Sequence, residues 1–268
     1  MREYKECYVA FIDVLGFKEL ISSQDCETIY QVFKELHMHS HGNLNFNGID
    51  ILAYKDIQHR ILSDSVILFI DANIKDSFAA LLDVCRKLQE SLANREKPIL
   101  MRGGIVKGLL FCEENTIFGE GLTNAYLLES RLAKYPRIVF SGETFEEGKK
   151  NAYYMFPFLE GMGFNSCCDE DNLFFVNYLP NLKGSIEETK EYSDRLYSLC
   201  NEMLNKAIDS NLREKYLWLK KKVDFSISRM PQVKELYDKE LEIQQDRETY
   251  EYNQRFKVFD IKTKNANE

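Results

Sequence analysis

The segment from Cys7 to Val14, with the sequence CYVAFIDV, constrains the fold more than any other part of the chain. It is apolar and rich in aromatic and β-branched residues, a pattern that predicts a buried strand. Asp13 lies near its end among apolar neighbours, and Gly16 follows shortly after. A carboxylate in this position is costly to bury unless it is paired or binds a cation. The segment therefore predicts both a core strand and a chemically active position.

Strand and helix patterns alternate along the next part of the chain. Apolar and β-rich runs predict further strands within residues 56–70 (two, joined by a tight turn at 63–65), 99–111, 116–119, 136–141, 153–159 and 173–179. Apolar residues at helical spacing predict helices over 17–38, 76–94 and 119–134. This order, βαββαββαβ, predicts an α+β sandwich with helices on one face of a mostly antiparallel sheet.

The character of the chain changes after Ile186. Residues 187–207, 212–223 and 231–256 are helical in pattern and heavily charged, without an obvious strand. Mixed charges of this kind are typical of a solvated helix face, although leucines and tyrosines among them could dock on the core or on a second subunit. We therefore expect a catalytic domain over residues 1–182 and a helical C-terminal extension over 183–268.

Charge and composition exclude several classes of function. With 35 basic and 43 acidic residues the net charge is −8, which argues against a general binder of nucleic acid or anionic membranes. No apolar run approaches the roughly 20 residues that span a bilayer, and the N-terminus lacks a signal-peptide layout. The seven cysteines are scattered without a CxxC pair, as in reduced cytosolic proteins. We therefore expect a cytoplasmic protein.

Asp13 and Asp64 are the candidate site. Asp64 lies at the tip of the predicted hairpin, between two apolar strands. Strands placed side by side would bring both carboxylates to one edge of the sheet, where Mg²⁺ or Mn²⁺ is bound together with substrate phosphates. The alternative is that each aspartate only caps a turn.

Four segments in order, FIDVLGF, ILSDS, MRGGIVKG and IFGEGLTNAYLLES, resemble the catalytic domain of class III adenylyl/guanylyl cyclases. The resemblance covers about residues 8–141 and implies a ferredoxin-like palm. It also implies two Mn²⁺ or Mg²⁺ ions on Asp13 and Asp64, and a head-to-tail homodimer with composite active sites. The main-chain amides after the first strand would wrap the triphosphate; they belong to Val14, Leu15, Gly16 and Phe17.

Within that family the chain looks most like the bacterial Pycsar pyrimidine cyclases. The resemblance implies that Arg60 and Thr116 read the base, and that arginine at this position accompanies cyclic CMP whereas tyrosine accompanies cyclic UMP. The two parallel donors of arginine suit the adjacent O2 and N3 acceptors of cytosine. The implied function is conversion of CTP to 3′,5′-cyclic CMP and diphosphate, as a messenger in antiphage defence. UTP is the alternative substrate, and Arg60 as a surface strand residue is the alternative role.

The chain departs from the adenylyl cyclase pattern on the helix that begins at Gly119. Where that family has an asparagine and an arginine, this sequence has Thr123 and Leu127, and leucine cannot stabilise charge developing on phosphate. Other cations would have to replace it; the candidates are Arg131, Lys134, Lys107 and Arg102, and Asn124 lies one position out of register.

Three other functions compete with the cyclase interpretation. The departures at Thr123 and Leu127 favour a catalytically degenerate nucleotide sensor, whereas the retained aspartates disfavour it. A polymerase-like palm would need adjacent acidic residues at the hairpin, and the Ser-Asp-Ser sequence there lacks them. An interaction module built on the C-terminal helices has only a charge pattern in its support.

Overall fold

The computed structural model describes residues 2–40, 45–46, 49–50, 55–152, 166–181, 185–206, 209–235 and 238. The strands of the main sheet are β1 (Lys5–Val14), β4 (Gln58–Leu62), β5 (Ser65–Asp71), β6 (Met101–Glu113), β7 (Thr116–Phe118), β8 (Ile138–Phe140), β9 (Ser166–Cys168) and β10 (Phe174–Val176). β2 (Asn45–Phe46) and β3 (Ile49–Asp50) form a separate pair. The helices are α1 (Phe17–Ser23), α2 (Cys26–Ser40), α3 (Ser77–Ala93), α4 (Glu120–Leu132), α5 (Gly142–Lys150), α7 (Ile186–Lys206) and α8 (Ser210–Ser228). No helix among these described residues is long and apolar enough to cross a membrane.

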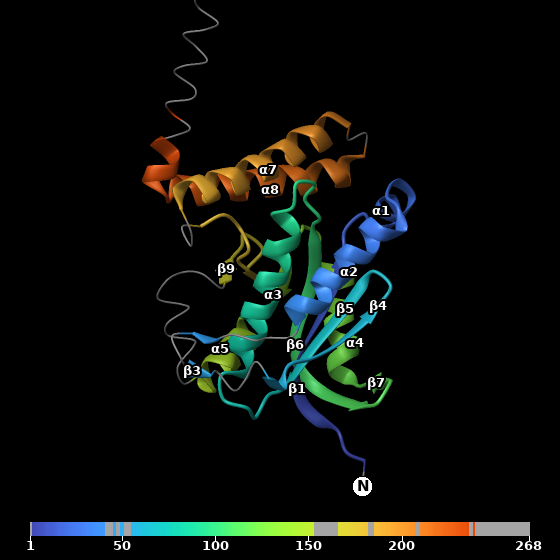
Figure 1. Cartoon of the computed structure of the whole chain (residues 1–268). Coiled ribbons are helices and arrows are strands. Elements are labelled where there is room, and N and C mark those ends of the chain that lie inside the picture. Colours follow the sequence, from blue (N-terminus) through green and yellow to red (C-terminus); the bar gives the residue numbers. More distant parts are fainter. Residues whose placement is uncertain are drawn as a thin grey trace, which may run out of the picture.

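The centre of the sheet has the strand order β4-β5-β1-β6, and every neighbouring pair in it is antiparallel. With α1 and α2 after β1, and α3 between β5 and β6, this is the βαββαβ arrangement of a ferredoxin-like palm. The sheet continues through β8, which is parallel to β6, to β10 and β9. The predicted α+β class is confirmed (Figure 1).

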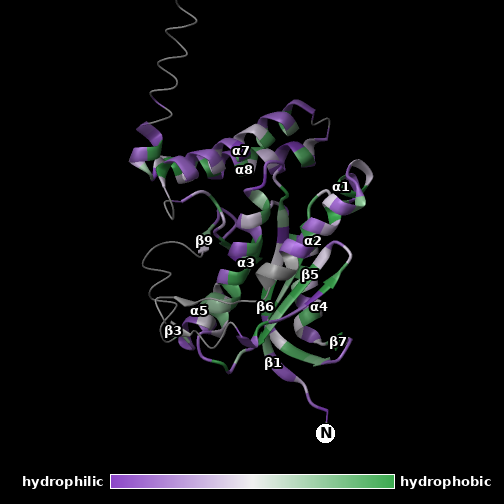
Figure 2. Cartoon of the chain, in the orientation of Figure 1, coloured by the Kyte–Doolittle hydropathy of each residue, from purple (hydrophilic) through white to green (hydrophobic). Residues whose placement is uncertain are grey.

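Helices cover both faces of the sheet, so the prediction that they lie on one face was wrong. Tyr8, Ala10 and Ile12 of β1 belong to an apolar cluster with α3. Val9, which points the opposite way, is buried in a second cluster with Ala125 of α4. Because successive residues of a strand face opposite sides, a strand apolar at every position must be covered on both. The central strands are accordingly mostly hydrophobic in Figure 2.

Two helices differ from the sequence prediction. The helix expected over residues 17–38 is divided into α1 and α2, because Asp25 begins a new helix: its Oδ1 accepts a hydrogen bond from the Thr28 amide at 2.8 Å. The other difference is α5, a helix that was not expected, which starts where Ser141 Oγ accepts from the Thr144 amide at 3.1 Å. The strand expected over 153–159 lies outside the described residues.

The helices α7 and α8 lie across one end of the sheet (Figure 1). Their apolar residues join residues of the sheet domain in one buried cluster, which includes Leu100, Phe175, Tyr178, Leu196, Trp218 and Leu219. This contact explains why helices so rich in charge still have one hydrophobic face (Figure 2). Part of the predicted third helix, beyond residue 238, falls outside the described residues.

A buried ionic cluster fastens α8 to the sheet domain. Arg137, which has no exposed surface, forms ion pairs with Asp169 and Asp171. Asp169 also accepts a hydrogen bond from Trp218 Nε1 at 2.8 Å and pairs with Lys222 at 2.7 Å. Since every partner of Asp169 is charged or polar, this carboxylate is satisfied although it is buried.

Candidate active site

Asp13 and Asp64 meet at one end of the sheet. Asp13 is in register with Ser65, the residue after Asp64, and on its other side with Arg102 of β6. The Val14 amide donates to the Asp64 carbonyl at 3.0 Å, which fastens the β4–β5 turn to the end of β1. The structure therefore brings together the two carboxylates that the sequence analysis singled out.

Burial and like charge both act on Asp13, whose side chain is 20% exposed. Burial raises its pKa above the ordinary value of aspartate; the charge of Arg102 opposes this rise and that of Asp64 adds to it. A half-buried carboxylate beside a second one is a ready site for a cation. Hard oxygen donors from two carboxylates, completed by phosphate oxygens, suit Mg²⁺ and Mn²⁺.

Glu129 of α4 is a third acidic residue near this site, and the sequence analysis missed it. It is 3% exposed, and its Oε1 lies 2.7 Å from Arg102 Nε. The Nε–H bond of Arg102 points instead to Asp13 Oδ2, at 3.5 Å, so Glu129 Oε1 has no hydrogen-bond partner among the described residues. Burial raises the pKa of Glu129; Arg102 opposes this, and both aspartates add to it.

These three acidic residues do not form a ready three-carboxylate centre. Within the described part of the chain, no group of three or more histidine, cysteine, aspartate or glutamate side chains is spaced to hold a metal ion. The geometry thus fits ions held by Asp13, Asp64 and a phosphorylated ligand. Glu129 is ion-paired with Arg102. Glu129 was detectable in principle, since it lies four positions after Ala125 on the helix face that covers the sheet.

We expect the metal-free Asp13→Asn variant to gain stability relative to the unaltered chain as the pH rises. A carboxyl whose pKa is raised by folding stabilises the fold below its unfolded pKa, and that contribution is lost as the pH rises through the folded pKa. Asparagine carries no such charge. Urea unfolding with a chelator at pH 4 and pH 7 measures the difference; an unchanged difference would contradict this account of Asp13.

The segment after β1 turns at a glycine before the next helix begins. Gly16 has a φ of 71°, in the left-handed region that favours glycine, and α1 begins at Phe17. Two of the four amides predicted to wrap a triphosphate already donate within the fold: Val14 to Asp64 and Leu15 to Leu100, at 2.9 Å. Among the described residues the amides of Gly16 and Phe17 have no such partner, so they are the two of the four that could donate to an anion at this end of β1.

Arg60 and Thr116 lie near each other at the β6–β7 hairpin. Arg60 donates to the Glu114 carbonyl at 2.7 Å, to Cys112 Sγ at 3.2 Å and to the His59 carbonyl at 2.7 Å. Thr116 opens β7 two residues later and lines a pocket of about 330 Å³. The structure thus places both predicted base-reading residues at one edge, and it shows that Arg60 also holds β4 to the hairpin.

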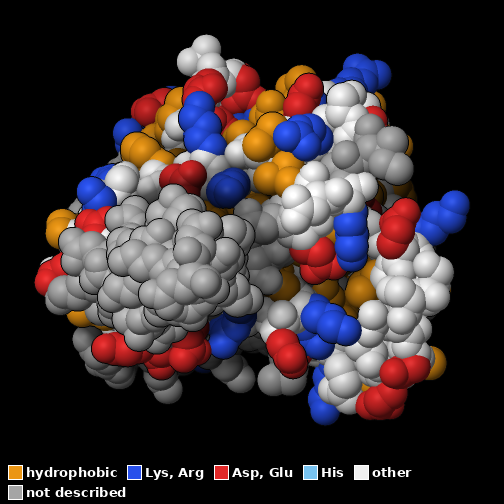
Figure 3. Space-filling view, turned by 90° about the horizontal axis from the view of Figure 1, so that it is seen from above, with side chains coloured by type: hydrophobic (Ala, Val, Ile, Leu, Met, Phe, Trp, Pro, Cys, Tyr) orange, Lys and Arg blue, Asp and Glu red, His pale blue; other side chains and the backbone are white. Residues whose placement is uncertain are grey.

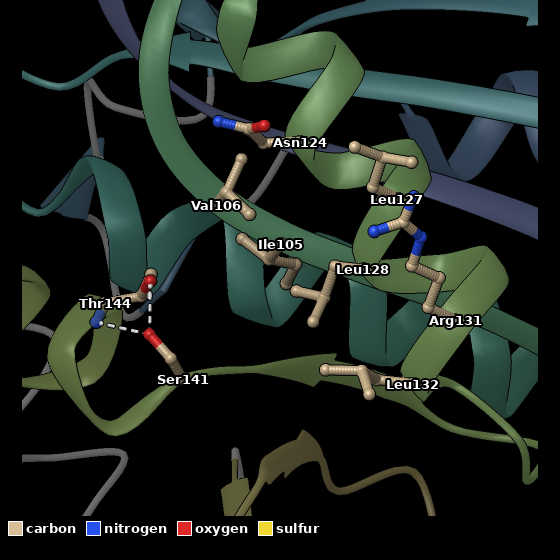
Figure 4. Close-up of a pocket in the computed structure, with 9 residues that line it drawn as sticks. All are labelled: Ile105, Val106, Asn124, Leu127, Leu128, Arg131, Leu132, Ser141 and Thr144. Carbon is tan, nitrogen blue, oxygen red and sulfur yellow. Dashed lines mark hydrogen bonds between the residues drawn. The ribbon is translucent and has the colours of Figure 1, made fainter.

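Leu127, one of the two α4 positions that depart from the adenylyl cyclase pattern, faces a second pocket. It has a volume of about 350 Å³ and is lined by Ile105, Val106, Asn124, Leu127, Leu128, Arg131, Leu132, Ser141 and Thr144. Figure 4 shows Arg131 beside Leu127, so a cation lies one helical turn from the leucine. The Thr123 hydroxyl instead donates to the Gly119 carbonyl at 3.3 Å.

The other candidate cations are engaged within the fold. Lys107 pairs with Glu6 at 3.0 Å, and Lys134 pairs with Glu214 of α8. Arg102 lies between Glu129 and Asp13, as expected of a structural arginine. Of the candidates proposed from sequence, Arg131 is therefore the one that shares a pocket with Leu127.

No known family description matches the chain, and no curated protein does. Among solved structures, it is similar to the monomeric guanylyl cyclase domain of the RhoGC fusion protein from the aquatic fungus Blastocladiella emersonii. Identity is 15%, the match covers 65% of this chain and 96% of that one, and the TM-score is 0.47. It is also similar to an adenylate/guanylate cyclase/hydrolase from Silicibacter pomeroyi, with 14% identity, coverage of 65% and 98%, and a TM-score of 0.41.

Proposed function

We propose that this chain is a class III nucleotide cyclase that converts CTP to 3′,5′-cyclic CMP and diphosphate. The main support for the proposal is that Asp13 and Asp64 are neighbours at the end of β1. Both carboxylates lie beside a turn whose Gly16 and Phe17 amides have no hydrogen-bond partner among the described residues. This combination suits a metal-bound triphosphate, and the four sequence segments named above support the family.

In the proposed reaction the ribose 3′-hydroxyl attacks the α-phosphorus of the same nucleotide. The new P–O bond closes the 3′,5′-cyclic phosphate, the bond from the α-phosphorus to the oxygen that bridges to the β-phosphate breaks, and diphosphate leaves. The hydroxyl proton passes to an aspartate carboxylate or to water. Divalent ions held by Asp13 and Asp64 would supply Lewis-acid activation and charge neutralisation. The chain's own residues orient the substrate: the Gly16 and Phe17 amides donate to phosphate oxygens. Glu129 pairs with Arg102 and so offsets part of the positive charge beside Asp13.

Base selection is assigned to Arg60 and Thr116. Arg60 uses one Nη1 donor and both Nη2 donors within the subunit, so offering two parallel donors to O2 and N3 of cytosine requires it to release an Nη2 contact, to Cys112 Sγ or to the Glu114 carbonyl. UTP is the alternative substrate. In a head-to-tail homodimer these two residues would serve the site whose aspartates belong to the other subunit. We further propose a cytoplasmic role as the messenger-forming enzyme of a Pycsar-type antiphage system.

Incubation with each of the four nucleoside triphosphates and Mn²⁺, followed by mass analysis of the products, tests this proposal. We expect cyclic CMP from CTP. A cyclic UMP product would contradict the assignment of Arg60 while retaining the cyclase. The absence of any cyclic nucleotide would overturn the proposal and favour a nucleotide sensor, the second candidate, which Leu127 in place of the family arginine supports.

Replacement of Arg60 with tyrosine is expected to shift the product from cyclic CMP towards cyclic UMP. Loss of a charge-assisted pair of hydrogen bonds to cytosine should change the CTP-to-UTP preference by about tenfold or more. The ratio of the two products from an equimolar mixture measures the change. The control is Arg213→Tyr on the exposed side of α8, which should leave the ratio unchanged; an unaltered ratio in Arg60→Tyr contradicts the base assignment.

A further inference from the structure

Lys215 of α8 is a half-buried lysine that makes no hydrogen bond or ion pair with any described residue. Its position on the helix explains why it is partly covered. Leu219, four residues later, is fully buried, and Tyr216 packs against the same apolar cluster. Residues four apart share a helix face, so Lys215 lies at the border of the docked face. A partly desolvated ammonium without a partner is unfavourable until an anion meets it.

The contacts on either side of Lys215 hold α8 against the segment between α4 and β8. Glu214 pairs with Lys134, which follows α4, and the Trp218 ring stacks on Tyr135 with 5.3 Å between ring centroids. The cluster beneath α8 also includes Leu15, two residues after Asp13. Figure 1 shows α8 across the end of the sheet opposite the N-terminus, the end where β1 finishes.

Charged residues of the candidate site interact electrostatically with Lys215. Burial and then the positive charge of Arg102 lower its pKa, whereas Asp209 and Asp13 raise it. The ammonium therefore shares the electrostatic environment of Asp13 and Arg102. Seen from above, the described surface carries basic and acidic side chains interspersed, without a uniformly basic patch (Figure 3). A polyanion that binds at this end of the sheet therefore needs individual lysine or arginine side chains that lie within reach of it.

We propose that Lys215 binds the triphosphate of the nucleotide held at Asp13 and Asp64, as a cation that the C-terminal helices supply to the active site. This inference rests on the proposed function. The acidic residues Asp13, Asp64 and Glu129 outnumber Arg102 there, and a triphosphate adds further negative charge. Lysine is a compact point charge that suits phosphate oxygens. Its charge would also replace part of the positive charge that is missing because Leu127 stands where the family has an arginine.

The test compares Lys215→Met, which keeps the length of the side chain, with Lys215→Arg, which keeps the charge. Binding of inorganic tripolyphosphate with Mn²⁺ is measured by calorimetry, and the KM for CTP by product formation. We expect Lys215→Met to weaken tripolyphosphate binding about tenfold or more and to raise the KM, and Lys215→Arg to retain most of both. The control is Lys221→Met, at an exposed lysine of the same helix that pairs with Glu170.

Two readouts separate this inference from the proposed function. If the unaltered chain forms a cyclic nucleotide but Lys215→Met binds tripolyphosphate as tightly as Lys221→Met does, the role of Lys215 is overturned and the cyclase stands. If no nucleotide is cyclised but Lys215→Met still loses tripolyphosphate binding, the cyclase falls and the anion-binding lysine stands. Thermal unfolding midpoints within a few degrees of the unaltered chain show that each variant is folded.

Discussion

Replacement of Asp13 or Asp64 with alanine is expected to lower cyclic nucleotide formation by on the order of 10³-fold or more. Each change removes one of the two carboxylates that the fold places together, so the remaining one cannot hold both ions and the triphosphate loses its charge neutralisation. Loss of a single preorganised electrostatic contact already costs rates of this size in other enzymes. Initial rates with CTP and Mn²⁺ measure the effect.

The matched control is Asp71→Ala. Asp71 ends the same strand, β5, at its other end, where it is in register with Cys7 rather than with Asp13. Its loss should leave turnover within about threefold, because surface changes away from a site usually have small effects. An active Asp64→Ala protein would disprove the metal assignment, whatever the behaviour of Asp71→Ala.

The largest effect on stability is expected from Asp169→Ala, at about 3–5 kcal/mol, since it leaves the buried Arg137 charge with only the solvent-screened carboxylate of Asp171 as a partner. It also removes the acceptors of Trp218 and Lys222, and with them the contacts that fasten α8. Although burial opposes it, hydrogen bonds from Lys222, the Glu170 amide and Trp218 keep the pKa of Asp169 below its ordinary value. That contribution is present above the ordinary pKa and is lost as the pH falls through the folded one, so the cost should shrink in acid.

Asp171→Ala provides the comparison for this second prediction. Asp171 pairs with the same arginine, but its side chain is 44% exposed. A solvent-screened pair of this kind is expected to contribute about 1 kcal/mol or less. Urea unfolding of both variants at neutral pH measures the two costs. Equal losses of unfolding free energy in the two variants would contradict the conclusion that Asp169 contributes more than Asp171 to the attachment of α8.

The sequence was informative where a pattern is local. The run CYVAFIDV and the turn at Asp64 predicted β1 and the β4–β5 hairpin, and pairing of those strands necessarily placed Asp13 beside Asp64. The helix on the second face was also readable in principle: β1 is apolar at successive positions such as Val9 and Ala10, which requires cover on both sides.

Other features depend on contacts between distant segments and leave little trace in the sequence. Arg60 donates to the main-chain carbonyl of Glu114. Every residue has such a carbonyl, so the sequence does not reveal this contact. Lys215 lies some two hundred positions from Asp13, on a helix whose charge pattern alone indicates a solvated face. Only the docking of α8 through Trp218 reveals that this helix packs on the sheet domain, in one cluster with Leu15.

The domain boundary remains a proposal near residue 182, but the two parts are not independent in their packing. Tyr178 of the sheet domain donates to the Pro136 carbonyl at 2.7 Å and accepts, through its own carbonyl, from the Tyr192 hydroxyl of α7 at 2.9 Å. All three residues lie at the interface between sheet and helices. We therefore propose that the C-terminal helices and the sheet domain form one structural unit.

Counting the Mn²⁺ ions bound in the presence of 3′-deoxy-CTP, which cannot cyclise, tests the central claim most directly. Equilibrium dialysis of the unaltered chain, Asp13→Asn and Asp64→Asn gives the stoichiometry without any dependence on turnover. The account predicts two Mn²⁺ per nucleotide in the unaltered chain, and the loss of at least one of them in each variant. Equal stoichiometry in all three proteins would contradict the assignment of Asp13 and Asp64 as the metal site.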